Sequence, residues 1–241
     1  MVGWLDVQPG LRPGRPEAVR LFGLTLLRVP LPPEAGGWRT RRVLKALGRR
    51  DVRRVLLPRD FQCWAALNRT GLAAVEPLGL CRAMAPRLAE ALLEPIPPRQ
   101  RAVLLRGRGS SAALLPPLAE ALCPMTAALM ADTDRGFEAL AAGLSQRSGL
   151  TLLRPSQGPP PQVTVELSPG PEGPGTCLRL WGRPDLAGLS LRPDLPEPPR
   201  GADSLALAGL LWETGRLKMG QIQVVRPGVP LDIEGKRSYN S

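Results

Sequence analysis

The residues with the clearest potential for chemistry form one glycine-rich turn, Arg106-Gly107-Arg108-Gly109-Ser110-Ser111-Ala112. The turn follows the apolar run 102–105 and precedes a segment with helical periodicity. It matches the pattern G-x-G-x-x-G/A, in which glycine permits a tight turn and lets a phosphate approach the backbone closely. Backbone N–H groups at the start of the following helix would then face the negative charge. The turn therefore predicts a site for a phosphate-bearing ligand, contacted by Gly107, Gly109, Ser110 and Ser111.

Three apolar runs and the segments between them would position this turn. The runs cover residues 102–105, 126–130 and 150–153, and both intervening segments have helical periodicity. A β-α-β-α-β order predicts a parallel sheet with helices packed on it. We expect the three runs to be neighbouring or near-neighbouring parallel strands with right-handed crossovers.

A carboxylate at the end of the second run adds a candidate ribose contact. Asp132 lies 25 positions after Gly107, near the place where dinucleotide-binding sheets carry an acidic residue for the ribose. With the glycine turn, the run Met130-Ala131-Asp132-Thr133-Asp134 resembles the second strand and turn of Rossmann-type nicotinamide dehydrogenases. The resemblance covers about 50 residues and one short motif. It implies NAD or NADP as the cofactor, phosphate contacts from the turn and a ribose contact from Asp132.

Two features depart from that family's pattern. Pro116 and Pro117 fall where the first helix should already be under way, and each removes an N–H donor. A helix that begins only at Pro116 would leave the turn without the donors that hold phosphate. The chain also shows no Lys–Asp pair and no histidine placed for hydride transfer. The alternative interpretation is an ordinary turn between strand and helix, in a non-enzymatic protein-interaction domain on a Rossmann-like scaffold.

The absence of histidine limits catalysis at every site. A general acid or base at neutral pH would have to be a perturbed Asp, Glu, Cys, Lys or Tyr. The four cysteines form no C-x-x-C pair, so the usual zinc constellations are excluded. Cys63 could lie near a helix N-terminus, but without a histidine base we favour a buried structural cysteine. The sequence predicts no catalytic residue and no metal ligand.

Basic residues give the chain a net charge of +11, and all but three of them are arginine. Arg49, Arg50, Arg53 and Arg54 gather around one turn between a helix and a strand, where they could neutralise phosphates. Only Trp38 accompanies them, and Trp64 is interpreted as a core or interface residue. The arginine preference also resembles the coding bias of high-GC bacterial genomes. We therefore favour a solvated arginine surface and expect nucleic acid not to be the partner, with a basic nucleic-acid-associated module as the alternative.

The rest of the chain is expected to contain further strands and helices. After an irregular lead-in over 1–18, strands are predicted at 21–29 and 52–57. Helices are predicted at 38–47, 61–67 and 78–93, the last interrupted at Pro86. Beyond residue 156, the runs 163–167 and 177–181 predict an antiparallel hairpin, followed by a helix at 203–214 and a strand at 222–225.

The predicted class is α/β: a mostly parallel Rossmann-like sheet flanked by helices, with an antiparallel hairpin in the C-terminal third. We divide the chain into an N-terminal α/β region, 1–98, a Rossmann-like region, 99–225, and a loose tail, 226–241. The two regions would be lobes with a cleft between them or parts of one continuous sheet. No apolar stretch is long enough for a membrane span, and prolines interrupt the N-terminus. We therefore expect a cytoplasmic protein.

Overall fold

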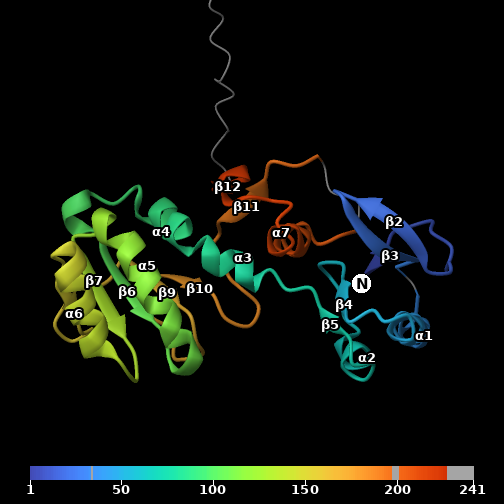
Figure 1. Ribbon diagram of the computed structural model, residues 1–241, viewed down its shortest axis with the longest axis horizontal. Coiled ribbons are helices and arrows are strands. Elements are labelled where there is room, and N and C mark those ends of the chain that lie inside the picture. Colours follow the sequence, from blue (N-terminus) through green and yellow to red (C-terminus); the bar gives the residue numbers. More distant parts are fainter. Residues whose placement is uncertain (34, 197–200, 227–241) are drawn as a thin grey trace, which may run out of the picture.

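The computed structural model describes residues 1–33, 35–196 and 201–226. Two lobes lie side by side, each built on its own five-stranded sheet, and a helix and a two-stranded sheet lie between them (Figure 1). The predicted α/β class is confirmed. The sheets are separate, so the two halves of the chain form no continuous sheet.

The first lobe contains sheet A, in the order β2-β3-β1-β4-β5. Its strands are β1 (Val2–Val7), β2 (Glu17–Leu21), β3 (Leu24–Leu31), β4 (Arg54–Leu56) and β5 (Ala73–Ala74). All neighbours pair in parallel except β2 and β3, which are antiparallel. The expectation of an irregular lead-in over 1–18 was wrong, because β1 is the central strand of this sheet. The run 21–29 is not one strand either, since Phe22 and Gly23 turn the chain with φ of 47° and 75°.

Two helices pack beside sheet A, as the sequence predicted. Helix α1 (Gly37–Gly48) buries Thr40, Leu44 and Leu47, whose spacing places them on one face, and exposes its basic residues. Helix α2 (Trp64–Asn68) is short and packs against α1. The buried residues of both helices join a small core around Leu5 and Val29 of the sheet.

The second lobe contains sheet B, in the order β10-β9-β6-β7-β8. Its strands are β6 (Ala102–Arg106), β7 (Ala128–Asp132), β8 (Leu152–Leu153), β9 (Val163–Glu166) and β10 (Thr176–Arg179). All four pairings are parallel. The three central runs of the sequence are therefore neighbouring parallel strands, as predicted.

The predicted antiparallel hairpin from 163–167 to 177–181 was wrong, because β9 and β10 are parallel. The loop between them returns along the sheet and packs on Thr164, whose hydroxyl donates to the carbonyl oxygen of Pro174 at 2.6 Å. At Gly173 a Cβ would lie 2.6 Å from the side chain of Thr164, so a larger residue would push the loop away. The antiparallel pair of the C-terminal third consists instead of β11 (Ser190–Pro193) and β12 (Ile222–Val225).

The helices of the second lobe cover one face of sheet B. They are α3 (Leu78–Ala83), α4 (Ala85–Leu93), α5 (Leu115–Leu122) and α6 (Phe137–Ser148), and 3-10 turns lie at Pro98–Gln100, Gly109–Leu114, Cys123–Met125 and Met219–Gln221. The predicted interruption near Pro86 is confirmed, since α3 and α4 meet at Met84. Alternate strand residues such as Val103 and Val165 face these helices in the main core.

The opposite face of sheet B carries a small cluster, Ala102, Leu104 and Met130. Proline- and glycine-rich loops cover it: a Cβ at Gly158 would lie 2.3 Å from the sulfur of Met130. This face also presents the charged residues at the carboxyl ends of the strands.

Helix α7 (Ser204–Glu213) connects the lobes. Asp203 caps it by accepting hydrogen bonds from the N–H groups of Leu205 and Ala206 at 2.9 and 3.2 Å, and residues 206–211 are buried. The main hydrophobic core includes residues of sheet B, of α7 and, in sheet A, Trp4, Leu26 and Leu56.

The division of the chain at 98/99 remains a prediction. Helices α3 and α4, from the first predicted region, pack on the second lobe, where α4 contacts α5 and β9. All but the first residue of the predicted loose tail lies outside the described residues. Within the described part of the chain, no helix combines the length and apolar character that crossing a bilayer requires.

Candidate functional site

The glycine turn lies at the place where parallel α/β sheets commonly bind ligands. Counted from β6 along the chain, the order β8-β7-β6-β9-β10 is 3-2-1-4-5. Doubly wound sheets share this strand order, although in sheet B helices cover one face only and loops cover the other. The direction of strand addition reverses at β6, so a crevice is expected outside the carboxyl ends of β6 and β9. Gly107 directly follows β6 at this position.

The helix after the turn begins later than the resemblance implies. Gly109–Leu114 forms a 3-10 turn that contains Ser110 and Ser111, and α5 starts only at Leu115, with Pro116 and Pro117 in its first turn. A Cβ at Gly107 would lie 3.2 Å from the side chain of Leu115 and from the carbonyl oxygen of Ser111. The space beside Gly107 is therefore occupied by the protein itself.

The N–H groups of the turn already have partners. The N–H of Gly107 donates to the backbone carbonyl of Asp132 at 3.1 Å, and that of Arg108 donates to the hydroxyl of Ser168 at 3.1 Å. The N–H of Gly109 lies 3.3 and 3.4 Å from the two carboxylate oxygens of Asp134. A carboxylate of this chain thus lies where the phosphate of a ligand would be expected.

Asp132 belongs to a line of alternating charges that we call the charge row. It consists of Asp132, Arg106, Glu166 and Arg179, which end the neighbouring strands β7, β6, β9 and β10 at the same register. Arg106 lies 3.2 Å from Asp132 and 3.3 Å from Glu166, and Arg179 lies 3.8 Å from Glu166. Arg108 adds a contact to Asp132 at 3.4 Å. Glu166 is 3% exposed, so its charge depends on these partners.

The structure thus brings Gly107, Gly109 and Asp132 to one edge of sheet B, and it places Ser110 and Ser111 in the adjoining 3-10 turn. Sequence reasoning missed Arg106 as the partner of Asp132, and it missed Glu166 as the second carboxylate that Arg106 contacts. In the sequence, each of these two residues stands at the end of an apolar run. That they lie side by side could be recognised only once the order of the strands was known. The binding of a nucleotide at this edge of sheet B remains a prediction.

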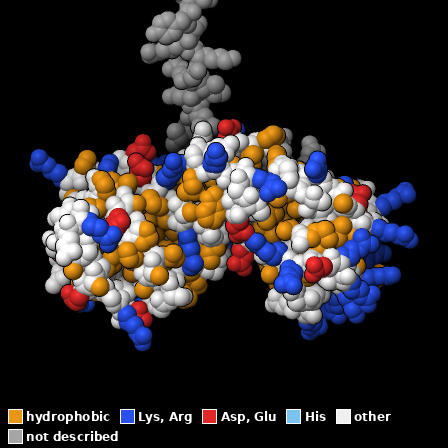
Figure 2. All heavy atoms as spheres, in the orientation of Figure 1, with side chains coloured by type: hydrophobic (Ala, Val, Ile, Leu, Met, Phe, Trp, Pro, Cys, Tyr) orange, Lys and Arg blue, Asp and Glu red, His pale blue; other side chains and the backbone are white. Residues whose placement is uncertain are grey.

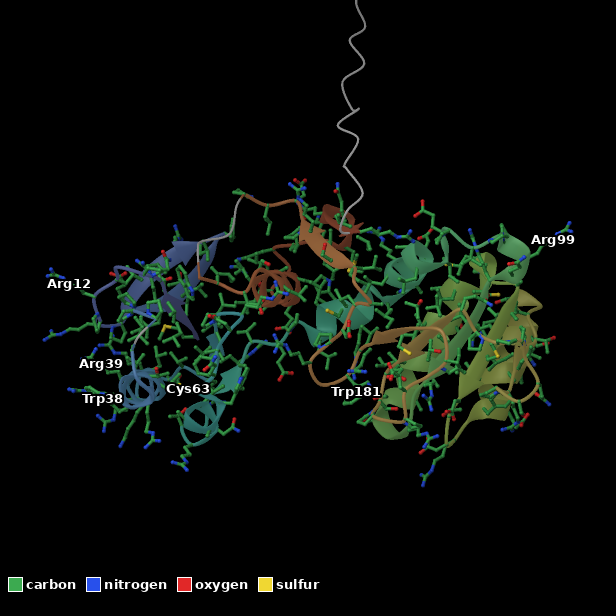
Figure 3. The ribbon with its side chains drawn as sticks, turned by 180° about the vertical axis from the view of Figure 1, so that it is seen from behind. Arg12, Trp38, Arg39, Cys63, Arg99 and Trp181 are labelled. Atoms are coloured by element: carbon green, nitrogen blue, oxygen red, sulfur yellow. The ribbon has the colours of Figure 1, made fainter. Side chains whose placement is uncertain are left out.

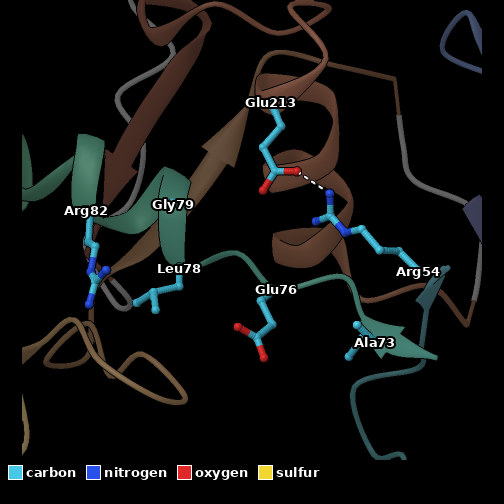
Figure 4. Close-up of a pocket in the computed structure, with 8 residues that line it drawn as sticks. Arg54, Ala73, Glu76, Leu78, Gly79, Arg82 and Glu213 are labelled. Atoms are coloured by element: carbon cyan, nitrogen blue, oxygen red, sulfur yellow. Dashed lines mark hydrogen bonds and ion pairs between the residues drawn. The ribbon is translucent and has the colours of Figure 1, made fainter. Parts of the chain in front are cut away.

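A second candidate site is a cavity of about 390 Å³ between the lobes (Figure 4). Its charged lining residues are Arg54, Glu76, Arg82 and Glu213. Arg54 pairs with Glu213 at 2.7 Å. Arg82 donates to the carbonyl oxygens of Leu180 and Leu167 at 3.0 and 3.2 Å. Since Arg54 and Arg82 connect neighbouring elements, they have a structural explanation that needs no ligand.

Two of the four cysteines carry thiols that burial keeps protonated. Cys63 is half-buried before the five-residue helix α2. Burial raises the pKa of the Cys81 thiol to about 12 and also raises the pKa of the Cys177 thiol, which keeps both protonated at neutral pH.

The third candidate is a basic surface on the first lobe. Residues 37–59 contain nine Arg or Lys and one Asp, a net charge of +8, whereas the other 218 residues contain 23 basic and 20 acidic residues, a net charge of +3. We define the basic surface by the exposed members of this segment: Arg39, Arg41, Arg42, Lys45, Arg49, Arg50, Arg53 and Arg59. Figure 2 shows Lys and Arg side chains gathered over the end of the molecule where Figure 1 places α1.

Acidic side chains do not neutralise this surface within the described part of the chain, where the only ion pair of residues 37–59 joins Arg54 to Glu213. Of the basic surface itself, Arg39 lies over the ring of Trp38 at 5.3 Å, and Arg50 donates to the backbone carbonyl of Pro16 at 3.5 Å. The positive charges are therefore free to meet an anionic partner.

Two exposed tryptophans accompany the basic surface. Trp38 is 63% exposed and Trp64 is 49% exposed, and the only other exposed large hydrophobic residue in the described chain is Met1. A Cβ at Gly37 would lie 4.0 Å from the sulfur of Cys63, so the starts of α1 and α2 adjoin (Figure 3). The sequence interpretation allowed Trp64 to be a core or an interface residue, and its exposure excludes only the core.

Comparison of the chain with protein-family models and with curated proteins finds no match to either. The fold and the three candidate sites therefore carry the functional argument.

Proposed function

We propose that this chain binds the phosphate backbone of nucleic acid through the basic surface, as a non-enzymatic binding module. The observation that carries the proposal is the concentration of charge: a net +8 in 23 residues, exposed on one end of the molecule. Phosphate-binding proteins use this arrangement because neutralising a polyanion releases its condensed counterions. The proposal replaces our expectation that nucleic acid is not the partner.

A coding bias towards arginine does not account for this distribution. Such a bias would favour arginine over lysine throughout the chain, but it would not remove acidic residues from one segment. The rest of the chain is nearly balanced in charge and pairs many of its arginines, for example Arg28 with Asp6 at 2.6 Å. The concentration of positive charge is therefore a property of this surface rather than of the composition.

The salt dependence of binding tests the proposal. We expect the purified chain to bind a fluorescein-labelled 20-nucleotide single strand, with log K falling linearly with log salt and a slope of about −3 to −5. That slope corresponds to roughly four to seven phosphate contacts, which the eight side chains of the surface can supply. Fluorescence anisotropy between about 50 and 200 mM salt measures it. A chain that shows no binding at the low end of this range contradicts the proposal.

A second candidate function is nucleotide or dinucleotide binding, with NAD or NADP as the implied ligand, at the glycine turn. The observation in its favour is the strand order, which places Gly107 and Gly109 at the switch point of sheet B. The ligand phosphate would have to displace Asp134 from the N–H of Gly109, and its ribose would have to compete with Arg106 and Arg108 for Asp132.

This competition gives the second candidate a specific prediction. If a nucleotide binds at the turn, Asp134→Ala should increase the thermal shift produced by NAD, NADP or ATP, because the competing carboxylate is gone. Gly109→Asn should abolish the shift: asparagine tolerates the φ of +57° at this position but adds a side chain where the phosphate would approach. Asp185→Ala, an exposed change elsewhere on the same lobe, is the control. No shift with wild type or with Asp134→Ala would exclude this candidate.

A further inference from the structure

We infer that the basic surface recognises unpaired nucleobases, which stack on Trp38 and Trp64, so that its partner is single-stranded nucleic acid. The inference rests on the proposed function, since the arginines supply the phosphate contacts, and it adds a base-recognition element to them. It also distinguishes single strands from duplexes and from other polyanions.

The exposure of the two rings is the first observation. Leaving large aromatic side chains in water forgoes the free energy of burying them, and folded domains bury most such side chains. Here the only two exposed tryptophans of the described chain both lie beside its strongest positive charge. Ring faces next to cationic side chains are the combination that binds single strands, because every base has a π-face and every nucleotide has a phosphate.

The second observation is that neighbouring side chains contact both rings. Trp64 makes an edge-to-face contact with Phe61, with 5.4 Å between ring centroids, and Phe61 itself is buried. Trp38 lies under the guanidinium of Arg39, a group that can also stack on a base. Because Trp64 packs on a buried ring, it loses little conformational entropy when a base stacks on it.

The relative position of the rings is the third observation. Trp38 follows Gly37 and Trp64 follows Cys63, and these two preceding residues adjoin where α1 meets α2 (Figure 3). A single strand that passes over this junction would meet both rings and then the arginines of α1. The bases of a duplex are already stacked on each other, so a duplex could offer this surface only its phosphates.

Tryptophan and arginine together also occur on helices that bind anionic membranes. Such helices bury a broad apolar face in the lipid. In α1 the apolar residues Leu44 and Leu47 are fully buried in the core of the lobe, so they are not available to lipid. The structure therefore favours nucleic acid over a membrane surface.

The test compares five ligands at one salt concentration: a 20-nucleotide oligothymidylate, the same backbone without bases, a 20-base-pair duplex, heparin, and phosphatidylserine vesicles. We expect the oligothymidylate to bind at least about tenfold more tightly than the abasic strand or the duplex. Binding should also quench tryptophan fluorescence. Trp38→Ala and Trp64→Ala should each weaken oligothymidylate binding by roughly tenfold and leave abasic binding unchanged.

One control variant and the choice between the two test variants separate stacking from damage to the fold. Trp181→Phe changes a tryptophan of the other lobe, whose indole N–H is buried without a hydrogen-bond partner among the described residues, and it should not alter binding. Trp64→Ala removes the contact to Phe61, whereas Trp38 is the more exposed ring, so Trp38→Ala decides the result if Trp64→Ala unfolds.

The outcomes distinguish the inference from the proposed function. Equal affinity for oligothymidylate, abasic strand and heparin, unchanged in Trp38→Ala, would overturn the inference and leave the phosphate-binding function intact. Absence of binding to every polyanion would overturn both. Binding to vesicles but not to oligonucleotides would also overturn both, and it would assign the surface to a membrane.

Discussion

Replacing Arg41, Arg42, Arg49 and Arg53 with glutamine should weaken binding to a single-stranded 20-mer by roughly 100- to 1000-fold near 0.1 M salt. All four side chains are exposed, and none forms an ion pair within the described chain. Each phosphate contact to a single strand contributes about 0.7 to the slope of log K against log salt, so the slope should also fall by about 3. Glutamine keeps a polar, uncharged side chain at these exposed positions, so the protein should remain folded.

A matched variant distinguishes the surface from the net charge of the whole chain. Arg99, Arg135, Arg183 and Arg192 are also exposed and without ion pairs among the described residues, and none belongs to the basic surface. Their replacement with glutamine removes the same four charges and should change affinity by less than about tenfold, because charges beyond a Debye length are screened. If both variants lose affinity equally, the basic surface is not the binding site.

The sequence predicted the elements whose periodicity is strong. Helix α1, the broken helix α3–α4, helix α6 and the three neighbouring strands of sheet B were all found at the expected places. Helix α6 illustrates why: it carries Leu140 and Leu144 one turn apart and ends at Gly149, whose φ of 67° suits glycine. In such elements the spacing of apolar residues and the backbone preference of the terminal residue together determine where the element lies and where it ends.

The errors came from features that depend on distant parts of the chain. Strand β1 was missed because Gly3 and Asp6 interrupt its apolar residues, although its middle is fully buried between β3 and β4. The carboxylate of Asp6 is tolerated there because Arg28, from β3, lies 2.6 Å away. The orientation of β10 depends on how the loop through Gly173 folds back on Thr164, and no alternation within the strands indicates it.

In the candidate sites, too, features decided by local sequence could be predicted, and features that depend on distant residues could not. The position of the glycine turn directly after a buried strand could be predicted from one apolar run and one motif. Its place at the switch point of sheet B could not, because that depends on the pairing of β9 with β6. The hydrogen bonds of the turn could not be predicted, because their acceptors, Asp132, Asp134 and Ser168, lie in two other segments of the chain. Likewise, the arginines around residue 50 were evident, but Trp64 joins them only through the packing of α1 against α2.

Replacing Arg106 with methionine should lower the free energy of unfolding by about 3–5 kcal/mol, the usual cost of removing one partner from a buried ion pair. Arg106 joins Asp132 and Glu166 across three neighbouring strands. Without it Glu166, at 3% exposed, would keep a buried charge whose remaining ion-pair partner is Arg179, at 3.8 Å. Methionine has a similar length, so lost packing should contribute little. Urea denaturation at pH 7 measures the effect.

Two further variants identify the cause of this loss of stability, and they test whether Asp132, the predicted ribose contact, is available to a ligand. Adding Glu166→Gln to Arg106→Met removes the stranded charge, while the amide oxygen can still accept from the N–H of Gly173, so much of the loss should be recovered. Arg108→Gln changes a side chain that is 54% exposed and should cost less than about 1 kcal/mol. This order of effects would establish that Asp132 is held by the charge row for stability. If Arg106→Met instead costs less than about 1 kcal/mol, the row is dispensable and Asp132 is available to a ligand, which would strengthen the nucleotide candidate over the nucleic-acid one.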